Sequence, residues 1–190
     1  MTREELDQLL ALKRIILLDG DIDDEMAAAV KFWLMAFNVK SDEGINILID
    51  TDGGSVQPAL ALYDLIKISS APVTGIVVGD CKSMGVILLQ ACHIRMATPH
   101  SDFYIHNLAW KNPVLSVDDF FNKMFRKKET ELKKLKTKII NILKRRSGLS
   151  TKKIKELMND GENYGTHFFA DEALRLGLID KIVKKSPFSE

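Results

Sequence analysis

The sequence is poor in cysteine and has no long apolar run, and each of these absences excludes a class of protein. Its two cysteines, Cys81 and Cys92, are too few for a disulfide framework and lack the spacing of a zinc site, so we interpret both as buried, reduced thiols. No uninterrupted apolar stretch approaches the ~20 residues of a transmembrane helix. Acidic side chains within residues 4–7 stand where a secretory signal requires basic and then apolar residues. We therefore expect a cytoplasmic protein without a membrane partner and without a bound metal.

The chain also lacks the internal repeats and low-complexity linkers that would divide it into parts. Its 190 residues are 46% hydrophobic and 28% charged, values typical of a soluble globular protein, and we treat residues 1–190 as a single domain. Between Phe121 and Lys155 the charges are almost all basic. Because no aromatic residues interleave with these lysines on the same face, we interpret them as a solvated helix face and expect no nucleic-acid partner.

Short aliphatic runs alternate with helical segments along the chain. Strands are predicted at 14–18, 45–50, 73–78, 94–97 and 103–106. Helices are predicted from the aspartates at 21–24 to about 39, from about 56 to 69, over 84–91 and from 150 onward, before a last helix and strand within 171–183. Such alternation predicts an α/β fold, in which helices cover a parallel sheet.

A long amphipathic helix is predicted at about 117–146. A sequence that resembles a capping box begins at Ser116, and Ser147 with Gly148 ends the helix. About 30 residues at 1.5 Å each give ~45 Å, more than a small domain needs to cover its own sheet. We expect this helix to project and to contact another subunit. Four apolar residues are expected at that contact: Phe121, Phe125, Leu132 and Leu135.

Ser83 stands where a buried strand turns into an apolar helix, within Gly79–Gly85. A serine there can cap the first helical turn or act as a nucleophile, because free backbone N–H groups favour a developing negative charge. Gly53 and Gly54 follow another strand and leave backbone N–H groups unobstructed, as an oxyanion hole or an anion cradle requires. His106 ends a strand and should emerge where α/β folds bind ligands. Three further histidines are interpreted as structural or surface residues: His93, His100 and His167.

These and other motifs together resemble the Clp protease proteolytic subunit family. They are Arg14–Leu18 with Gly20, Ile47–Asp50 with Gly53–Val56, Ala61–Asp64, Ser83–Gly85 with Leu88 and Leu89, Tyr104–Asn107, and Asp171–Ala173 with Gly177–Asp180. The similarity runs from about residue 8 to residue 183, and the compact chain resembles phage or plasmid-encoded relatives. The resemblance implies a crotonase/ClpP-like spiral of ββα units with a long protruding helix.

The resemblance also implies a serine endopeptidase that cleaves peptides or unfolded proteins without a cofactor. In the family, the serine of the Ser-Met-Gly motif is the nucleophile and the histidine of the Ile-His motif is the base, and these fall on Ser83 and His106. The oxyanion donors are the backbone N–H groups that fall on Gly54 and Met84. The implied assembly is a homo-oligomer of two stacked heptameric rings joined through the long helices, with an ATP-dependent unfoldase as partner.

The acid that orients the histidine in the family has no obvious counterpart in this chain. Counting back from Glu172 places Gly165 at the usual position, and a glycine cannot orient a histidine. Counting forward from the helix that begins at Ser150 places the acid at Asp160, before a short insertion. We therefore assign Asp160 as the third catalytic residue, with Glu162 and then Asn163 as alternatives.

Two other aspartates are assigned different roles. Asp102 shares a strand face with His106, but four residues at ~3.3 Å each separate their backbones too far for direct contact. Asp171 is interpreted as the cap of the last helix.

Two other functions stay open. A non-catalytic ring subunit would keep the fold and support active partners. A crotonase-type acyl-CoA enzyme also uses paired backbone N–H groups, but it would not need the pair of Ser83 and His106. Reaction with a fluorophosphonate distinguishes the peptidase from both alternatives.

Overall fold

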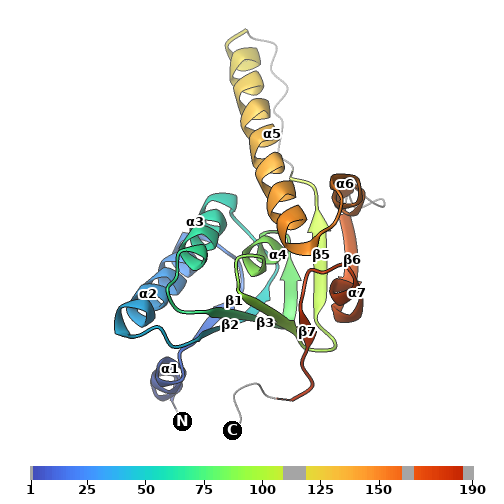
Figure 1. Ribbon diagram of the computed structural model, residues 1–190. Coiled ribbons are helices and arrows are strands. Elements are labelled where there is room, and N and C mark those ends of the chain that lie inside the picture. The colour runs from blue at the N-terminus through green and yellow to red at the C-terminus, as the bar shows by residue number, and fades with distance from the viewer. Residues whose placement is uncertain (1, 109–118, 160–164, 186–190) are drawn as a thin grey trace.

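The computed structural model describes residues 2–108, 119–159 and 165–185, and it shows helices packed beside a mostly parallel sheet (Figure 1). The elements in chain order are α1 (Arg3–Leu12), β1 (Ile15–Asp19), α2 (Asp24–Lys40), β2 (Ile45–Thr51), α3 (Val56–Lys67), β3 (Val73–Lys82), α4 (Met84–Leu89), β4 (Ile94–Ala97), β5 (Asp102–His106), α5 (Asp119–Ser147), α6 (Thr151–Asn159), β6 (Gly165–Phe169), α7 (Ala170–Arg175) and β7 (Lys181–Ile182). The predicted α/β fold class is confirmed.

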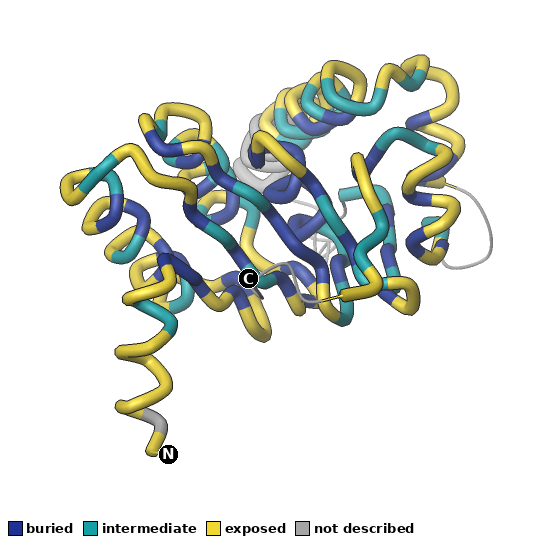
Figure 2. The backbone as a smooth tube through the Cα atoms, turned by 60° about the horizontal axis from the view of Figure 1, so that its bottom comes forward, coloured by how far each residue is buried: buried dark blue, intermediate teal, exposed yellow. Residues whose placement is uncertain are grey.

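Within the described residues, seven strands form one sheet. Strands β1, β2, β3, β4 and β7 pair in that order and all in parallel, whereas β5 pairs with β3 and, on its other side, with the antiparallel strand β6. Alternate residues of β2, Ile45, Ile47 and Ile49, are almost completely buried. Figure 2 shows the buried residues concentrated along the strands, whereas most of α1 is exposed. This pattern fits strands whose side chains alternate between two faces.

Strand β3 pairs with two different neighbours along its length. Its first half, Thr74–Val77, pairs with β4, and its second half, Asp80–Lys82, pairs with β5. The register with β2 shifts between these halves, and the Asp50 carboxylate accepts a hydrogen bond from the backbone N–H of Asp80 at 2.7 Å inside that bulge. A side chain at Gly79 would collide with this carboxylate. The sequence predicted that the strand ends at residue 78, but Gly79 permits a bulge instead of a stop, and the strand continues to the site.

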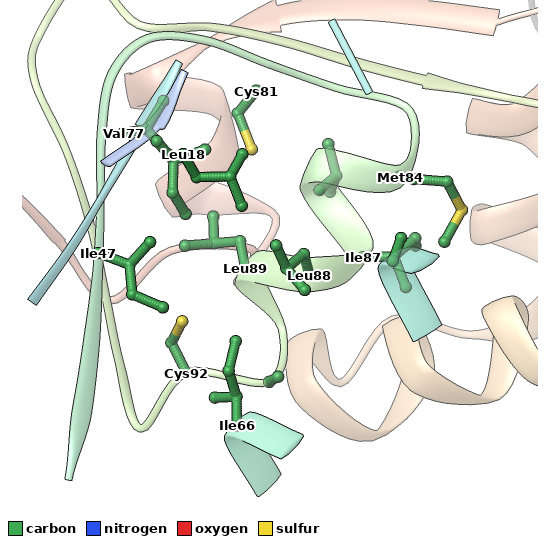
Figure 3. Packing of buried hydrophobic residues seen from close by; sticks show 14 of the residues in the cluster. Leu18, Ile47, Ile66, Val77, Cys81, Met84, Ile87, Leu88, Leu89 and Cys92 are labelled. Carbon is green, nitrogen blue, oxygen red and sulfur yellow. The ribbon is translucent and has the colours of Figure 1, made fainter. Parts of the chain in front are cut away.

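The helix that follows β3 is the centre of the core. All six residues of α4 are buried, and Figure 3 shows Met84, Ile87, Leu88 and Leu89 among the side chains of the surrounding cluster. A Cβ atom at Gly85 would lie only 2.5 Å from Cγ2 of Thr51. The glycine therefore lets the start of α4 pack directly against the end of β2.

Helix α5 projects from the rest of the molecule, as predicted (Figure 1). Its 29 residues correspond to roughly 44 Å, and the part of its predicted start before Asp119 lies outside the described residues. Near its C-terminal end, Ile139 and Leu143 are buried in the core. Arg146 Nη2 also donates to the carbonyl oxygen of Cys92 at 2.8 Å. Packing and hydrogen bonding thus fix the base of the helix to the core.

The strand β6 and the start of α7 differ from the sequence prediction. Residues 165–169 were not predicted as a strand, yet they pair with all of β5. This strand runs directly into α7, whose N-cap position is occupied by Phe169. The interpretation of Asp171 as a cap is therefore wrong: it lies within the first turn and pairs with Arg175 at 3.2 Å. An acid in that turn still interacts favourably with the helix dipole.

Among the described residues, no helix is both long enough and apolar enough to span a membrane.

The anchoring of α5 can be tested by comparing two leucine truncations. Leu143 is 1% exposed and Leu12 is 72% exposed, so only Leu143→Ala removes a packed side chain. We expect Leu143→Ala to lower the free energy of unfolding by about 2–5 kcal/mol, because it leaves a cavity between α5 and the core. Leu12→Ala should change it by less than about 0.5 kcal/mol. Urea denaturation followed by circular dichroism measures both, and equal effects would contradict the anchoring.

Candidate active site

Ser83 occupies a sharp turn between β3 and α4. It is one of two described non-glycine residues with a positive φ angle, with φ 51° and ψ −118°. Its backbone N–H donates to the carbonyl oxygen of Tyr104 at 2.7 Å, which holds the turn against β5. A backbone in such a region costs about 1–3 kcal/mol and persists only where its surroundings enforce it. Ser83 stands at the N-cap position, but within the described part of the chain its side chain makes no capping hydrogen bond.

The Ser83 hydroxyl contacts His106 instead. The distance from Ser83 Oγ to His106 Nε2 is 2.7 Å, within the range of a hydrogen bond. The pairing of β3 with β5 places the ends of both strands side by side and so brings these side chains together. Of the two roles that the sequence left open for Ser83, the geometry therefore favours the nucleophile over the helix cap.

The second nitrogen of His106 has a partner that the sequence analysis missed. Nδ1 lies 2.9 Å from the backbone carbonyl oxygen of Asn107. A carbonyl oxygen only accepts hydrogen bonds, so this contact requires a proton on Nδ1. The neutral imidazole then has its lone pair on Nε2, facing the Ser83 hydroxyl. In this tautomer the ring can act as a general base toward Ser83.

The glycine pair after β2 lies directly against the turn at Ser83. A Cβ atom at Gly53 would lie 2.7 Å from the Cβ of Ser83 and 3.1 Å from the backbone nitrogen of Met84. Gly53 and Gly54 both have positive φ angles, +101° and +144°. The Gly53 carbonyl accepts from Ile22 N–H at 2.7 Å, which fixes the loop. Because Met84 is the first residue of α4, its own helix offers no acceptor for its N–H. The arrangement can present two backbone N–H groups to a carbonyl oxygen that lies beside Ser83.

A cleft of about 760 Å³ opens in front of this group of residues. Its lining includes three acidic residues, Asp21, Asp23 and Asp52, together with Tyr104 and His167. A smaller apolar recess adjoins Ser83 and His106. Its aliphatic and thioether lining comes from five elements or loops: Met84, Ile87, Ile105, Leu108, Ile139, Leu143 and Met158. The recess encloses only about 10 Å³, which is too small for a side chain of a substrate.

The residues that precede Ser83 are unsuited to act as base or nucleophile. Lys82 Nζ donates to Asp80 at 2.5 Å and to Asp52 at 2.9 Å, and these hydrogen bonds raise the pKa of Lys82. Lys82 therefore stays protonated at neutral pH. Cys81 is completely buried, and burial raises the pKa of its thiol well above the ordinary value. A thiol in this state is a poor nucleophile.

The position of the third catalytic residue predicted from the sequence falls outside the described residues. This holds for Asp160 and for both alternatives, Glu162 and Asn163. Gly165 pairs with His106 across β5 and β6. Among the described residues, no carboxylate contacts the His106 imidazole.

The other aspartate on the same strand face, Asp102, has different partners. Its Oδ2 lies 3.3 Å from Nδ1 of His167 and 4.0 Å from Nζ of Lys82. As expected, it does not orient His106.

Strand β6 adds an aromatic stack to the cleft. The Tyr104 ring lies 4.1 Å from the ring of His167 and 5.1 Å from that of His106, nearly parallel to both. The place of His167 in the site could not be predicted from the sequence, because it depends on the pairing of residues 165–169 with β5. His93 is structural, as expected, since its Nδ1 accepts from Val73 N–H at 3.0 Å.

Across residues 2–108, 119–159 and 165–185, no group of three or more His, Cys, Asp and Glu side chains is arranged to hold a metal ion. That the reaction needs no metal and no cofactor stays a prediction from the sequence.

Two comparisons with known proteins bear on this site and fold. A family model described as Clp protease matches residues 2–186. The solved structure of a ClpP1 mutant from Listeria monocytogenes has a TM-score of 0.81 against this chain, at 21% sequence identity, and the match covers 96% of this chain and 98% of that chain. At this identity the structural match shows the fold alone. The crotonase/ClpP-like fold predicted from the sequence is confirmed.

The protection of both cysteines can be tested with a thiol reagent. Burial raises the pKa of the Cys92 thiol to about 12 and that of Cys81 well above its ordinary value. Figure 3 shows both sulfur atoms among apolar side chains. We expect iodoacetamide at pH 8 to leave the native protein unmodified, and to modify both cysteines in urea, as measured by mass spectrometry. Rapid modification of Cys81 in the native state would contradict this assignment.

Proposed function

Because this chain belongs to the Clp protease family, we propose that it is a serine endopeptidase whose nucleophile is Ser83 and whose general base is His106. The observation that carries the proposal is the 2.7 Å contact between Ser83 Oγ and His106 Nε2. The strained turn supports it further, because it directs the hydroxyl to the imidazole and not to the helix.

The proposed reaction proceeds through an acyl-enzyme. Nε2 of His106 takes the hydroxyl proton while Ser83 Oγ attacks the peptide carbonyl. The backbone N–H groups of Gly54 and Met84 donate to the resulting oxyanion. Protonated His106 then gives its proton to the leaving amine, which departs as the carbonyl re-forms. Water, deprotonated by the same imidazole, finally attacks the ester and releases the second product.

The two alternative functions have less support. A non-catalytic ring subunit has no need of a hydroxyl held in a strained turn against an imidazole. A crotonase-type acyl-CoA enzyme needs the paired N–H groups of Gly54 and Met84 but not the contact between Ser83 and His106. The same contact therefore favours a peptidase over both.

We further propose that the chain acts within a self-compartmentalised assembly, two stacked heptameric rings joined through α5. The supporting observation is that α5 projects far beyond its buried base, with Leu132 and Leu135 only partly buried (Figure 1). An ATP-dependent unfoldase would deliver unfolded proteins to such a compartment. Peptides would enter the compartment without the unfoldase.

Replacing either member of the proposed pair should abolish catalysis. Because nucleophile and base act as a unit, we expect Ser83→Ala and His106→Ala each to lower peptidase turnover by about 10⁴- to 10⁶-fold while folding stays intact. A fluorogenic peptide measures turnover, and mass spectrometry of the fluorophosphonate-treated protein locates the modified residue. The matched controls are Ser70→Ala and His100→Ala, both on exposed loops, which should keep full activity. Retained cleavage by Ser83→Ala would refute the assignment.

The assembly can be tested through the partly buried face of α5. We expect the native chain to sediment as a large oligomer at micromolar concentration, because an apolar stripe of this length needs a partner subunit. Replacing Leu132 and Leu135 together by Glu should produce smaller species. Lys134→Glu changes the charge of an exposed neighbour and should leave the assembly unchanged. A native protein that sediments as a monomer would contradict the proposed ring.

A further inference from the structure

The His106 imidazole is oriented by a neutral backbone group among the described residues. Its Nδ1 lies 2.9 Å from the carbonyl oxygen of Asn107, the residue immediately after it. A carbonyl fixes the tautomer in the same way as a carboxylate, because both only accept hydrogen bonds. It carries no full charge, however, so it stabilises an imidazolium less. The orientation of this carbonyl therefore matters for the proposed reaction.

The local packing leaves no room for a side chain at the position that faces His106 across the sheet. A Cβ atom at Gly165 would lie 2.6 Å from the Cβ of His106 and 2.6 Å from the carbonyl oxygen of Ile105. These contacts are shorter than real Cβ atoms make. Glycine at this position thus lets β6 approach β5 closely, and orientation of the imidazole has to come from another direction.

Asn107 lies just beyond the end of β5, so pairing between strands does not hold its peptide group. Its side chain supplies the missing restraint: Nδ2 donates to Oδ1 of Asn159 at 2.6 Å. Asn159 is the last residue of α6, and its own Nδ2 donates to the carbonyl oxygen of Lys155 at 2.8 Å, one turn earlier. The amide of Asn159 is therefore fixed at both ends, to its helix and to Asn107.

We infer that Asn159 is a positioning residue, which holds Asn107 so that the backbone carbonyl of Asn107 fixes the tautomer and the orientation of His106. The inference rests on the proposed function, since it concerns the same imidazole. The C-terminal end of α6 would then affect catalysis, in addition to the packing of this helix on the sheet. It also competes directly with Asp160, the acid assigned from the sequence.

The test is a double-mutant cycle on the two asparagines. Asn107→Ala and Asn159→Ala each remove the same hydrogen bond, and each should lower kcat by roughly 3- to 10-fold. KM should stay the same, because neither asparagine belongs to the described lining of the cleft. The double variant should lose no more than either single variant, since residues that act through one contact are not additive. Two independent variants keep the test valid if one of them does not fold.

A conservative variant and a matched control sharpen the test. Asn159→Asp keeps an oxygen that accepts from Asn107 but loses the donation to Lys155, so kcat should fall clearly less than in Asn159→Ala. Lys152→Ala removes an exposed side chain from the same helix and should have no effect. Rescue by Asn159→Asp distinguishes loss of this contact from general damage to α6.

Three results would overturn the inference. In the first, both alanine variants turn over as fast as the native protein. In the second, Asp160→Ala lowers kcat by about 10⁴-fold, as expected for a true third member of a triad, while Asn159→Ala has no effect. In the third, the native protein does not react with a fluorophosphonate at Ser83, which would refute the proposed function together with the inference. The first two results leave the proposed function intact.

Discussion

The pairing of β3 with two neighbours determines where the functional groups of this molecule lie. Its first half belongs to the parallel sheet with β4, and its second half leaves β4 and pairs with β5. The Asp50 carboxylate lies in the bulge between the halves and accepts a hydrogen bond from the backbone N–H of Asp80. Without this change of partner, the turn at Ser83 and the end of β5 would not meet. A polar side chain inside a bulge thus stabilises both the sheet and the geometry of the site.

Residues that end a local element could be located from the sequence alone. Ser83 and the pair Gly53 and Gly54 follow strands and His106 ends one, and parallel strands bring their carboxyl ends to one edge. The roles that the family resemblance adds for Gly54 and Met84 stay predictions. How close these groups lie could not be predicted, because it depends on the bulge at Gly79. The sequence prediction ended the strand at residue 78.

The rest of the site depends on contacts that no local sequence pattern predicts. His167 reaches Tyr104 only because residues 165–169 pair with 102–106, and segments so far apart in the chain leave no periodic signal of their partnership. The role of the Asn107 carbonyl could not be predicted from the sequence either. Every residue has a backbone carbonyl, and the direction in which it points depends on tertiary structure. The candidates drawn from the sequence, Asp160, Glu162 and Asn163, are all side chains, so a backbone carbonyl was not among them. The error at Asp171 has the same cause, since β6 moved the start of α7.

The base of α5 is also a wall of the apolar recess beside Ser83. Ile139 and Leu143 contribute to this wall, whereas the other end of the helix extends roughly 30 Å beyond Ile139. Because these two side chains belong to α5, a tilt of the whole helix would move them and so change the shape of the recess. A partner that binds the free end of α5 and prefers one tilt would then be thermodynamically linked to the shape of the recess, with the same coupling free energy in both directions.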